Sequence, residues 1–399
     1  MVFNFIRIYT INTNTVFYLN DEPCENLQIP DNIEIIKSYA FKNNSTIKKV
    51  IFPQSIRRIE EAAFSYCRNL ESIEIPNQCN FIGAYAFQNC HIKGKELLIP
   101  AAVDTIGTGA FGNCFFNNLL IENSKNTLVL YTSSFGFVKQ VTLHRNFKNR
   151  ASDYSSGSYS IIKDSLETII IGSEVSKIPS GTLYNKNVKK LIIEDANSTL
   201  ITPGRSLGNY YTQGEFNNCP LDYLYLGRSI SFRLFGIKGP TMDSFENSVT
   251  TLIIGDEVKD FGYAFEKTNV FSSVKKMDLG KSFNYLPDMS GSKALECIIV
   301  RNPIPPTAKG FANTTYLHCD LLVPDGCKER YMNADVWKSF WNIYEINEYV
   351  SGLKTTKESS SKTSKTDYYT IEGTKIDSPQ KGFNIIKIGD GITKKVIVR

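Results

Sequence analysis

The 399-residue sequence contains only three histidines, a side chain that catalysis and metal binding often use. His91, His144 and His318 show no metal-type or nucleophile-type spacing, and no HExxH, GxSxG or Walker A pattern occurs. Residues 107–112 match GxGxxG, but this stretch coincides with the repeat element described below. These absences argue against an enzyme, and we expect neither a metal ion nor a cofactor.

Long hydrophobic runs are also missing. No apolar stretch approaches the roughly 20 residues that a helix needs to cross a bilayer, so no transmembrane segment is predicted. Residues 1–7 alternate apolar and polar side chains instead of forming a basic start and an apolar block, which does not predict a secretion signal. Either the protein stays inside the cell or the sequence lacks its natural start.

An excess of one charge is confined to the C-terminal tail. Residues 351–399 hold ten basic and five acidic side chains, which leaves 35 of each sign in residues 1–350. Nucleic acids require a concentrated basic face, so a neutral body argues against a nucleic-acid partner.

The nine cysteines are an odd number without CxxC pairs or zinc-type spacing. Cys67, Cys90 and Cys114 share one position of the repeat, where Asn44 stands in another copy. We interpret them as small apolar core residues in a ladder. A disulfide or redox role is the alternative. The others are Cys24, Cys79, Cys219, Cys297, Cys319 and Cys327.

What the sequence does contain is an internal repeat. The pattern Ile75-Pro76, Ile82, Ala86-Phe87 and Cys90 returns at offsets of 23 or 24 residues. The other copies start at Ile29-Pro30, Phe52-Pro53 and Ile99-Pro100. Such a period is typical of a solenoid, in which each unit buries its apolar face only by stacking on the next.

Local patterns predict how each unit is built. Residues 70–75 favour a strand with Ile73 and Ile75 on the inner face, ended by Pro76, which has no N–H to donate. Residues 60–66 favour a short helical turn with the alanine and phenylalanine directed inward. We expect the phenylalanines of this motif to lie one above another, at Phe41, Phe64, Phe87 and Phe111.

These motifs resemble the BspA-type leucine-rich repeats, in which I-P, I-G and A-F-x-x-C recur in units of about 23 residues. Ile75-Pro76, Ile82-Gly83, Ala86-Phe87 and Cys90 carry the match, which is specific over residues 27–115. The resemblance implies an α/β-type solenoid, a right-handed superhelix with one strand per repeat. It also implies a bacterial cell-surface or extracellular setting and adhesion to host matrix proteins.

Beyond residue 115 the strands persist while the turns degrade. With three strands near residues 51, 74 and 98, the solenoid should have about twelve strands and a sheet roughly 50–55 Å long. The further strands are predicted at 119–121, 141–143, 166–171, 188–193, 221–226, 249–254, 274–279, 295–300 and 321–323.

Both ends of the solenoid, residues 27–323, should be capped. Residues 1–26 predict a hairpin cap, with Asn12-Thr13-Asn14 between its strands. Residues 324–350 resemble the terminal cap of the same family. We expect Trp337 and Trp341 to seal the last repeat, with a sugar-stacking platform as the alternative.

The C-terminal region has a different composition. Residues 351–366 are rich in Ser, Thr and Lys and predict a flexible linker. Residues 367–399 predict three short strands with a Gly389-Asp390-Gly391 turn. This segment resembles the Por-type sorting modules of surface and secreted bacterial proteins, and a plain terminal β-module is the alternative.

The outward positions of the strands form two columns, and the second is rich in apolar side chains. A long apolar stripe on an open sheet suggests a partner, although β-branched ladders also stabilise sheets by themselves. Tyr223 and Tyr225 offer flat faces and hydroxyl groups for a sugar or a peptide. The candidate binding residues are Tyr223, Tyr225, Ile192, Ile253 and Ile170.

Three functions remain open. The first is a non-enzymatic surface or secreted protein that binds a host or matrix protein, or a glycan, through its strand face. The second is a structural or self-associating module that forms a homo-oligomer. The third is an enzyme built on the irregular residues 195–220, with Tyr210, Tyr211 and Glu215, but no acid–base or nucleophile spacing supports it.

Overall fold

A computed structural model describes most of the chain, which divides into two compact units, residues 1–344 and 345–399. The described residues are 6–11, 14–19, 22–150, 161–162, 165–179, 187–201, 205–206, 212–213, 220–230, 249–259, 271–349, 366–369, 375–378, 382–388 and 392–398.

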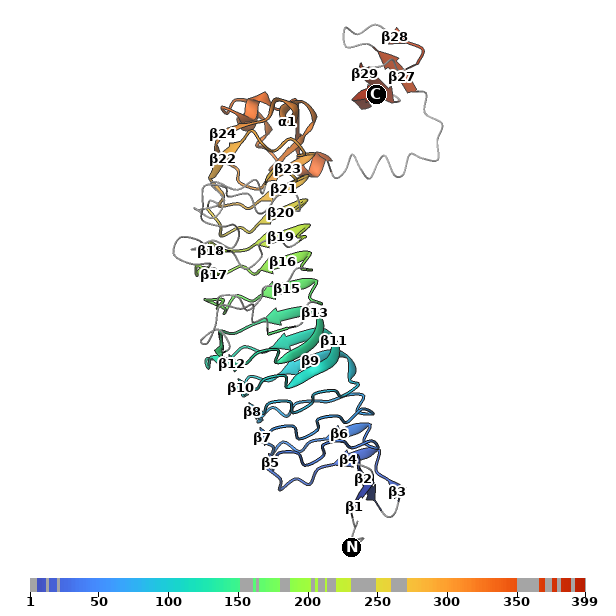
Figure 1. Ribbon diagram of the computed structural model, residues 1–399. Coiled ribbons are helices and arrows are strands. Elements are labelled where there is room, and N and C mark those ends of the chain that lie inside the picture. Colours follow the sequence, from blue (N-terminus) through green and yellow to red (C-terminus); the bar gives the residue numbers. More distant parts are fainter. Residues whose placement is uncertain are drawn as a thin grey trace. The chain divides into compact units, whose positions relative to one another are not determined.

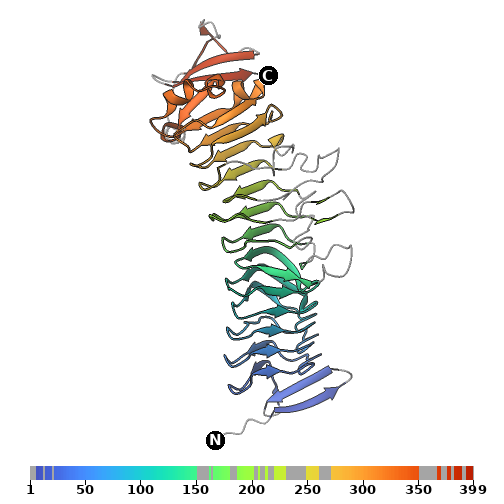
Figure 2. The same ribbon diagram turned by 90° about the vertical axis from the view of Figure 1, so that its left-hand side faces the viewer.

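The first unit is a parallel β-solenoid whose strands follow one another like rungs (Figures 1 and 2). Its main sheet has eleven strands, and those from β9 to β25 pair in parallel. In spatial order they are β9 (Lys93–Ile99), β11 (Phe111–Ile121), β13 (Phe135–Leu143), β15 (Thr168–Ile171), β16 (Lys190–Ile193), β19 (Tyr223–Leu226), β20 (Thr251–Ile254), β21 (Lys276–Leu279), β23 (Cys297–Val300), β25 (Asp320–Val323) and β26 (Asn342–Glu345).

The predicted leucine-rich-repeat solenoid is thereby confirmed, with one correction to its strands. Near the N-terminal end β4 (Asn26–Gln28) pairs with β6 (Lys49–Ile51). The predicted strand at 70–75 is reduced to a single bridge between Lys49 and Ser72. Ile73 and Ile75 are buried as the alternation requires. Alternation encodes which side chains face inward, whereas a hydrogen-bonded ladder depends on the distance between neighbouring coils.

A second parallel sheet forms another side of the coils and was not predicted. It consists of β5 (Ile35–Ile36), β7 (Arg58–Ile59), β8 (Phe81–Ile82), β10 (Thr105–Ile106), β12 (Leu128–Leu130) and β14 (Phe147–Asn149). The isoleucine of the I-G motif is the inward residue of these strands: Ile59, Ile82 and Ile106 are fully buried. The motif therefore marks a second strand in each coil.

The predicted phenylalanine stack is confirmed. The ring centroids of Phe64 and Phe87 lie 5.3 Å apart, those of Phe87 and Phe111 5.4 Å, and the stack continues to Phe135 at 5.7 Å. Phe41 begins it, 4.9 Å from Phe64. Each ring is thus packed between rings of the neighbouring coils, and its burial stabilises the stack by about 1.5–3 kcal/mol.

The predicted helical turn at residues 60–66 is wrong. Ala62 and Tyr66 have φ angles of 50° and 63°, which a right-handed helix does not allow. The N–H groups of Ala62, Phe64 and Tyr66 instead donate to carbonyl groups of the next coil, at 2.7–2.8 Å. Stacking of coils overrides the local helix propensity, because a backbone donor satisfied by the neighbouring coil needs no helical partner.

The cysteine ladder is a buried part of the core, as predicted. Cys67, Cys90 and Cys114 are fully buried and unpaired. Each thiol donates a hydrogen bond to a phenylalanine carbonyl of an earlier coil, with Sγ–O distances of 3.0–3.2 Å. Burial raises the pKa of the Cys114 thiol to about 12, so the thiol stays neutral and unreactive at physiological pH.

The ends of the first unit agree in part with the prediction. The N-terminal end carries an antiparallel hairpin of β1 (Ile6–Ile11) and β2 (Asn14–Leu19), followed by β3 (Glu22–Pro23). Trp337 is fully buried and its Nε1 donates to the carbonyl of Pro306 at 2.6 Å. Trp341 is 63% exposed, so it does not seal the last repeat. The 3-10 turn ends at Ser339 and Phe340 has an extended backbone, so the spacing of the two tryptophans does not place both rings on one face.

The remaining elements of the first unit are short. No helix among the described residues is long and apolar enough to span a bilayer. These elements are α1 (Asn313–His318), α2 (Lys328–Met332), the 3-10 turn η4 (Trp337–Ser339), the antiparallel pair β17 (Arg205–Ser206) and β18 (Thr212–Gln213), and the parallel pair β22 (Tyr285–Met289) and β24 (Thr307–Phe311).

The second unit holds a four-stranded antiparallel sheet. Its strands are β27 (Thr366–Tyr369), β28 (Lys375–Ile376), β29 (Gly382–Ile388) and β30 (Ile392–Val398). The sequence predicted three of these strands and missed β28, which has two residues. The Gly389-Asp390-Gly391 turn and, apart from Thr366, the linker at 351–366 lie outside the described residues, as do Tyr210, Tyr211 and Glu215.

Candidate binding surface

Four of the five predicted site residues form one continuous column on the outer face of the main sheet. Ile170, Ile192, Tyr225 and Ile253 are register partners on the consecutive strands β15, β16, β19 and β20. Tyr223 lies in the adjacent outward column, between Lys190 and Thr251. We call these five residues the strand-face patch.

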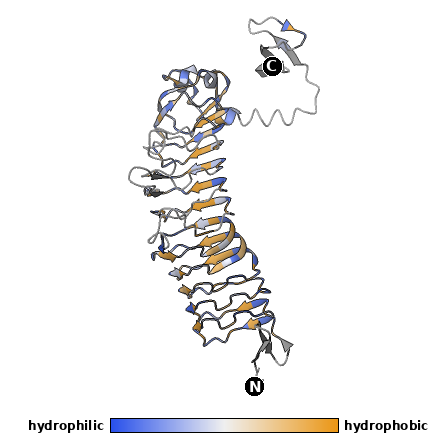
Figure 3. Cartoon of the chain, in the orientation of Figure 1, coloured by the Kyte–Doolittle hydropathy of each residue, from blue (hydrophilic) through white to orange (hydrophobic). Residues whose placement is uncertain are grey.

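Strict alternation places these side chains outward. In β15, β16, β19 and β20 half-exposed and buried residues alternate, so every second side chain enters the core. The apolar colouring of these strands in Figure 3 comes mainly from their buried residues, with one outward isoleucine in each of β15, β16 and β20. The patch is therefore an apolar surface that solvent reaches.

The two tyrosines have different surroundings. The Tyr225 hydroxyl donates to the carboxylate of Asp195, with distances of 2.9 Å to Oδ1 and 2.7 Å to Oδ2. Partial burial and this hydrogen bond raise the pKa of Tyr225 above its ordinary value. The Lys190 ammonium lies 4.5 Å from the Tyr223 ring centroid, within cation–π range. Both phenol rings are therefore held in place by a charged neighbour.

The apolar column does not run unbroken along the whole sheet. Asp278 follows Ile253 in register and is only 6% exposed. Both its carboxylate oxygens accept hydrogen bonds from the Arg301 guanidinium, at 2.7 and 2.8 Å. A paired charge thus ends the strand-face patch at β21.

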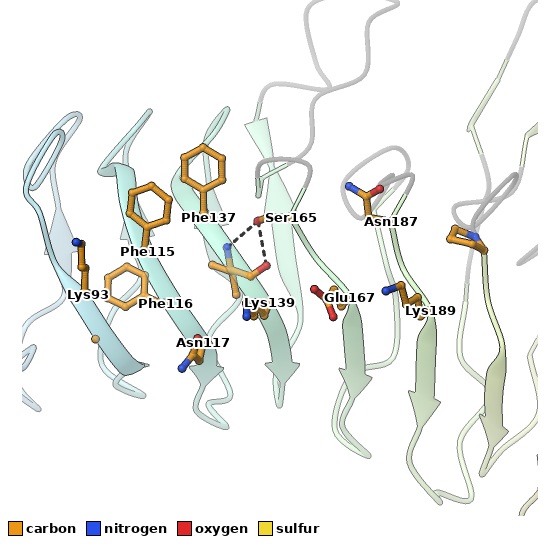
Figure 4. Close-up of a pocket in the computed structure, with 13 residues that line it drawn as sticks. Lys93, Phe115, Phe116, Asn117, Phe137, Lys139, Ser165, Glu167, Asn187 and Lys189 are labelled. Carbon is orange, nitrogen blue, oxygen red and sulfur yellow. Dashed lines mark hydrogen bonds between the residues drawn. The ribbon is translucent and has the colours of Figure 1, made fainter.

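A groove with a cavity volume of about 650 Å³ opens at the amino-terminal ends of β9 to β19 (Figure 4). Two rings dominate it: Phe115 is 47% exposed and stacks on Phe137 with centroids 4.6 Å apart and planes 7° from parallel. Figure 4 shows both rings standing side by side above the strands. The charged residues of the groove are Lys93, Lys139, Glu167 and Lys189.

The length of β11 and β13 creates this groove, because both strands begin well before their neighbours. Gly136 allows them to come together: a Cβ there would lie 2.5 Å from the carbonyl oxygen of Cys114, so no other residue fits. On the other side Ser165 holds Val138, whose N–H donates to Ser165 Oγ at 2.9 Å. The same hydroxyl donates to the Val138 carbonyl at 3.1 Å.

Sequence reasoning missed the groove. The available signal was Phe115 and Phe137, two aromatic residues 22 residues apart and therefore at equivalent places in successive coils. The Ser165 hydroxyl exchanges hydrogen bonds with the backbone N–H and carbonyl of Val138. No group of three metal-ligating side chains occurs in the part of the chain that the structure describes.

Comparison with known proteins finds solved structures that are similar to this chain at low sequence identity. No curated protein sequence matches it significantly. A leucine-rich repeat protein from Bacteroides ovatus is 17% identical over 85% of this chain and 90% of its own, with a TM-score of 0.32. The pneumococcal vaccine antigen PcpA is 18% identical over 81% and 79%, with a TM-score of 0.25. A leucine-rich cell surface protein from Faecalibacterium prausnitzii is 15% identical over 80% and 79%, with a TM-score of 0.22.

The family comparison is more direct. The model of the BspA-type leucine-rich repeat region matches in six copies, over residues 10–142 and 95–220, which together are more than half of the chain. The match extends past residue 115, where the motifs weaken but the strands and the phenylalanine stack continue. This chain belongs to the BspA-type leucine-rich repeat family.

Proposed function

We propose that this chain is a non-enzymatic adhesion protein of a bacterial cell surface, which binds a protein partner through the outer face of its main sheet. The surface setting is the expectation that membership of the family brings. The observation that carries the proposal is the strand-face patch, in which solvent-accessible apolar and aromatic side chains adjoin one another on four consecutive strands. Contiguous apolar patches of this kind mark interaction sites on soluble proteins.

The patch has the composition of an interface centre. Tyrosine is enriched at such centres because its ring gives a large contact area and loses little conformational freedom. The Asp195 carboxylate and Lys190 ammonium already fix the two rings, which lowers the entropy lost on binding. The alternative is that the rings of Tyr223 and Tyr225 bind a glycan.

Binding to a panel of extracellular-matrix proteins and glycans, measured by surface plasmon resonance, tests the proposal. We expect the double variant Tyr223→Ala/Tyr225→Ala to weaken binding of a matrix protein at least tenfold. The matched control is Tyr39→Ala/Tyr66→Ala, which removes two other tyrosines that are 50% and 38% exposed on the turn side of the coils. Binding that the control abolishes and the strand-face variant leaves intact would contradict the proposal.

Self-association is the second candidate, because the same apolar column could meet a second copy of the chain. Light scattering over a range of concentrations separates the two functions. A dimer that dissociates on dilution, and that the Tyr223→Ala/Tyr225→Ala variant lacks, favours the structural module. A monomer at all concentrations favours adhesion.

A further inference from the structure

A row of charged residues follows the edge of the solenoid where each coil enters the strand face. Each member donates its backbone N–H to the carbonyl of the member before it: Lys48 to Glu25 at 2.7 Å and Glu71 to Lys48 at 2.9 Å. The signs alternate along the row, and Lys48 and Glu25 also form an ion pair at 2.7 Å. We call this the edge row.

The alternation returns further along the solenoid. Lys139, Glu167, Lys189 and Asp222 are joined by the same backbone bonds, at 2.8, 2.9 and 2.8 Å. Opposite charges on neighbouring strands attract and like charges repel, so an alternating row is the favourable arrangement. Because each lysine stands beside an acid, this part of the edge has little net charge.

Asn117 interrupts the alternation. The register of β11 with β9 and β13 places Asn117 between Lys95 and Lys139, where the pattern calls for an acid. Two strand spacings separate the backbones of these lysines, about 10 Å. Two cations therefore flank a neutral amide, and a third, Lys93, lies two residues before Lys95 on the same strand.

The interruption coincides with the groove. Lys93, Asn117 and Lys139 line it together with the rings of Phe115 and Phe137. Among the residues that the structure describes, the side chains of Lys93, Lys95 and Lys139 take part in no ion pair or hydrogen bond. The exposed Phe115 ring and two lysines that form no ion pair, Lys93 and Lys139, therefore share one concave site.

We propose that this groove receives an acidic side chain of a protein partner, an aspartate or glutamate with an apolar neighbour. The partner's carboxylate takes the place that an acid at position 117 would occupy, and the apolar neighbour packs on the exposed Phe115 ring. The inference rests on the proposed function and names a second contact of the same partner, at the amino-terminal edge of the same sheet.

The charges beside the groove favour a single carboxylate over a polyanion. Glu167 lies one strand beyond Lys139, and Asp222 lies two strands further. A uniformly anionic polysaccharide along the groove would meet these carboxylates as well as the lysines. A protein surface can place one acid between Lys95 and Lys139 and a different residue opposite Glu167.

Selection from a randomised heptapeptide library on the immobilised full chain tests the inference. We expect the wild-type protein to enrich sequences with one Asp or Glu next to an apolar residue. The Asn117→Asp variant should bind these peptides at least tenfold more weakly, because its own carboxylate fills the gap. Its melting temperature should equal or exceed that of the wild type, since the new acid stands between two lysines. Phe115→Ala should also weaken binding about tenfold.

The matched control is Asn118→Asp, the same charge change at the next exposed position, which should alter binding less than twofold. Enrichment of peptides without acids, equal binding to Asn117→Asp, or no enrichment at all would overturn the inference. Tight binding of heparin or polygalacturonate that displaces the peptides would assign the groove to a glycan and overturn it too. Matrix-protein binding that Tyr223→Ala/Tyr225→Ala abolishes and Asn117→Asp leaves unchanged would retain the proposed function without the groove.

Discussion

The coils of residues 27–149 and those of residues 165–323 carry parallel strands on the same side of the solenoid. The two regions differ in the length and regularity of the rest of each coil. In the first region, successive coils are 22–24 residues apart, and the second sheet and the phenylalanine stack follow each other in regular order. In the second region, 33 residues separate the equivalent positions Lys190 and Tyr223, yet the two strands pair in full register. A four-residue strand is therefore enough to hold the face, and the rest of each coil can vary.

In both regions a buried arginine links two coils that are not adjacent. Arg145 is 1% exposed and donates to the carbonyls of Pro100 and Ala101, at 3.2 and 2.9 Å, two coils earlier. In the coil between, Glu122 accepts a hydrogen bond from the Ala101 N–H at 3.0 Å. We call this arrangement the arginine clamp.

The clamp recurs in the second region with different residues. Arg228, also 1% exposed, donates to the carbonyls of Gly172 and Ser173 at 2.8 and 2.9 Å. Glu194 of the intermediate coil accepts from the Ser173 N–H at 3.1 Å. Burial lowers the pKa of both arginines, and the nearby glutamates oppose this change. Each buried guanidinium group therefore has its hydrogen-bond partners only when three consecutive coils are stacked.

The largest effect should come from removing one ring of the phenylalanine stack in the first region. We expect Phe87→Ala to lower the free energy of unfolding by about 3–5 kcal/mol, because the neighbouring rings cannot close the cavity. Urea unfolding followed by circular dichroism measures the change. Phe115→Ala, at an exposed ring, is the control and should cost less than about 1 kcal/mol. Hydrogen exchange should localise the loss of protection to the first region, and equal losses in both regions would contradict the comparison.

An intermediate effect is expected from the clamp of the irregular region. Arg228→Met should cost about 2 kcal/mol, because two buried carbonyl groups lose their charged donor. Arg145→Met provides the equivalent change in the regular region and should cost a similar amount. Arg68→Met, at an exposed guanidinium 5.8 Å from the Tyr66 ring, is the control. If Arg228→Met is as stable as the wild type in thermal unfolding, the clamp is not what holds these coils.

The smallest effect concerns pH and involves one buried or partly buried cysteine from each region, Cys114 and Cys297. Burial raises the pKa of Cys114 to about 12 and that of Cys297 to about 11, against an ordinary value near 9. Below pH 8 the thiol is neutral in both the folded and the unfolded chain. The contribution of the buried thiol to the free energy of unfolding is then fully present. Above pH 9 only the unfolded thiol ionises, which favours unfolding by up to about 1.4 kcal/mol per pH unit until the folded pKa is reached.

Unfolding by urea at pH 8, 9 and 10 measures this loss. Cys114→Ala should remove about 1 kcal/mol of the difference between pH 8 and pH 10 that the wild type shows. Cys297→Ala should remove a similar amount, because the folded pKa of Cys297, about 11, also lies above pH 10. An unchanged pH dependence in Cys114→Ala would show that this thiol does not ionise on unfolding.

The sequence predicted the fold well where the same kind of side chain recurs at a fixed offset. The offset of Phe41, Phe64, Phe87 and Phe111 requires that their rings meet, because each coil can bury its apolar face only against the next. The strand-face patch was predicted for the same reason, since period-two alternation determines which side chains point outward. The groove was not, because it depends on where β11 and β13 begin and on the close approach that Gly136 allows.

By itself, the amino-acid sequence determined the solenoid, the position of its core residues and the outward direction of Ile170, Ile192, Tyr225 and Ile253. Periodicity determines these features because each residue has the same place in every coil. Only the tertiary structure decided that residues 60–66 form an inter-coil ladder in place of a helical turn, and that Asn117 stands between two lysines. These features arise from residues 22 or more positions apart, whose distances are set by the stacking of coils.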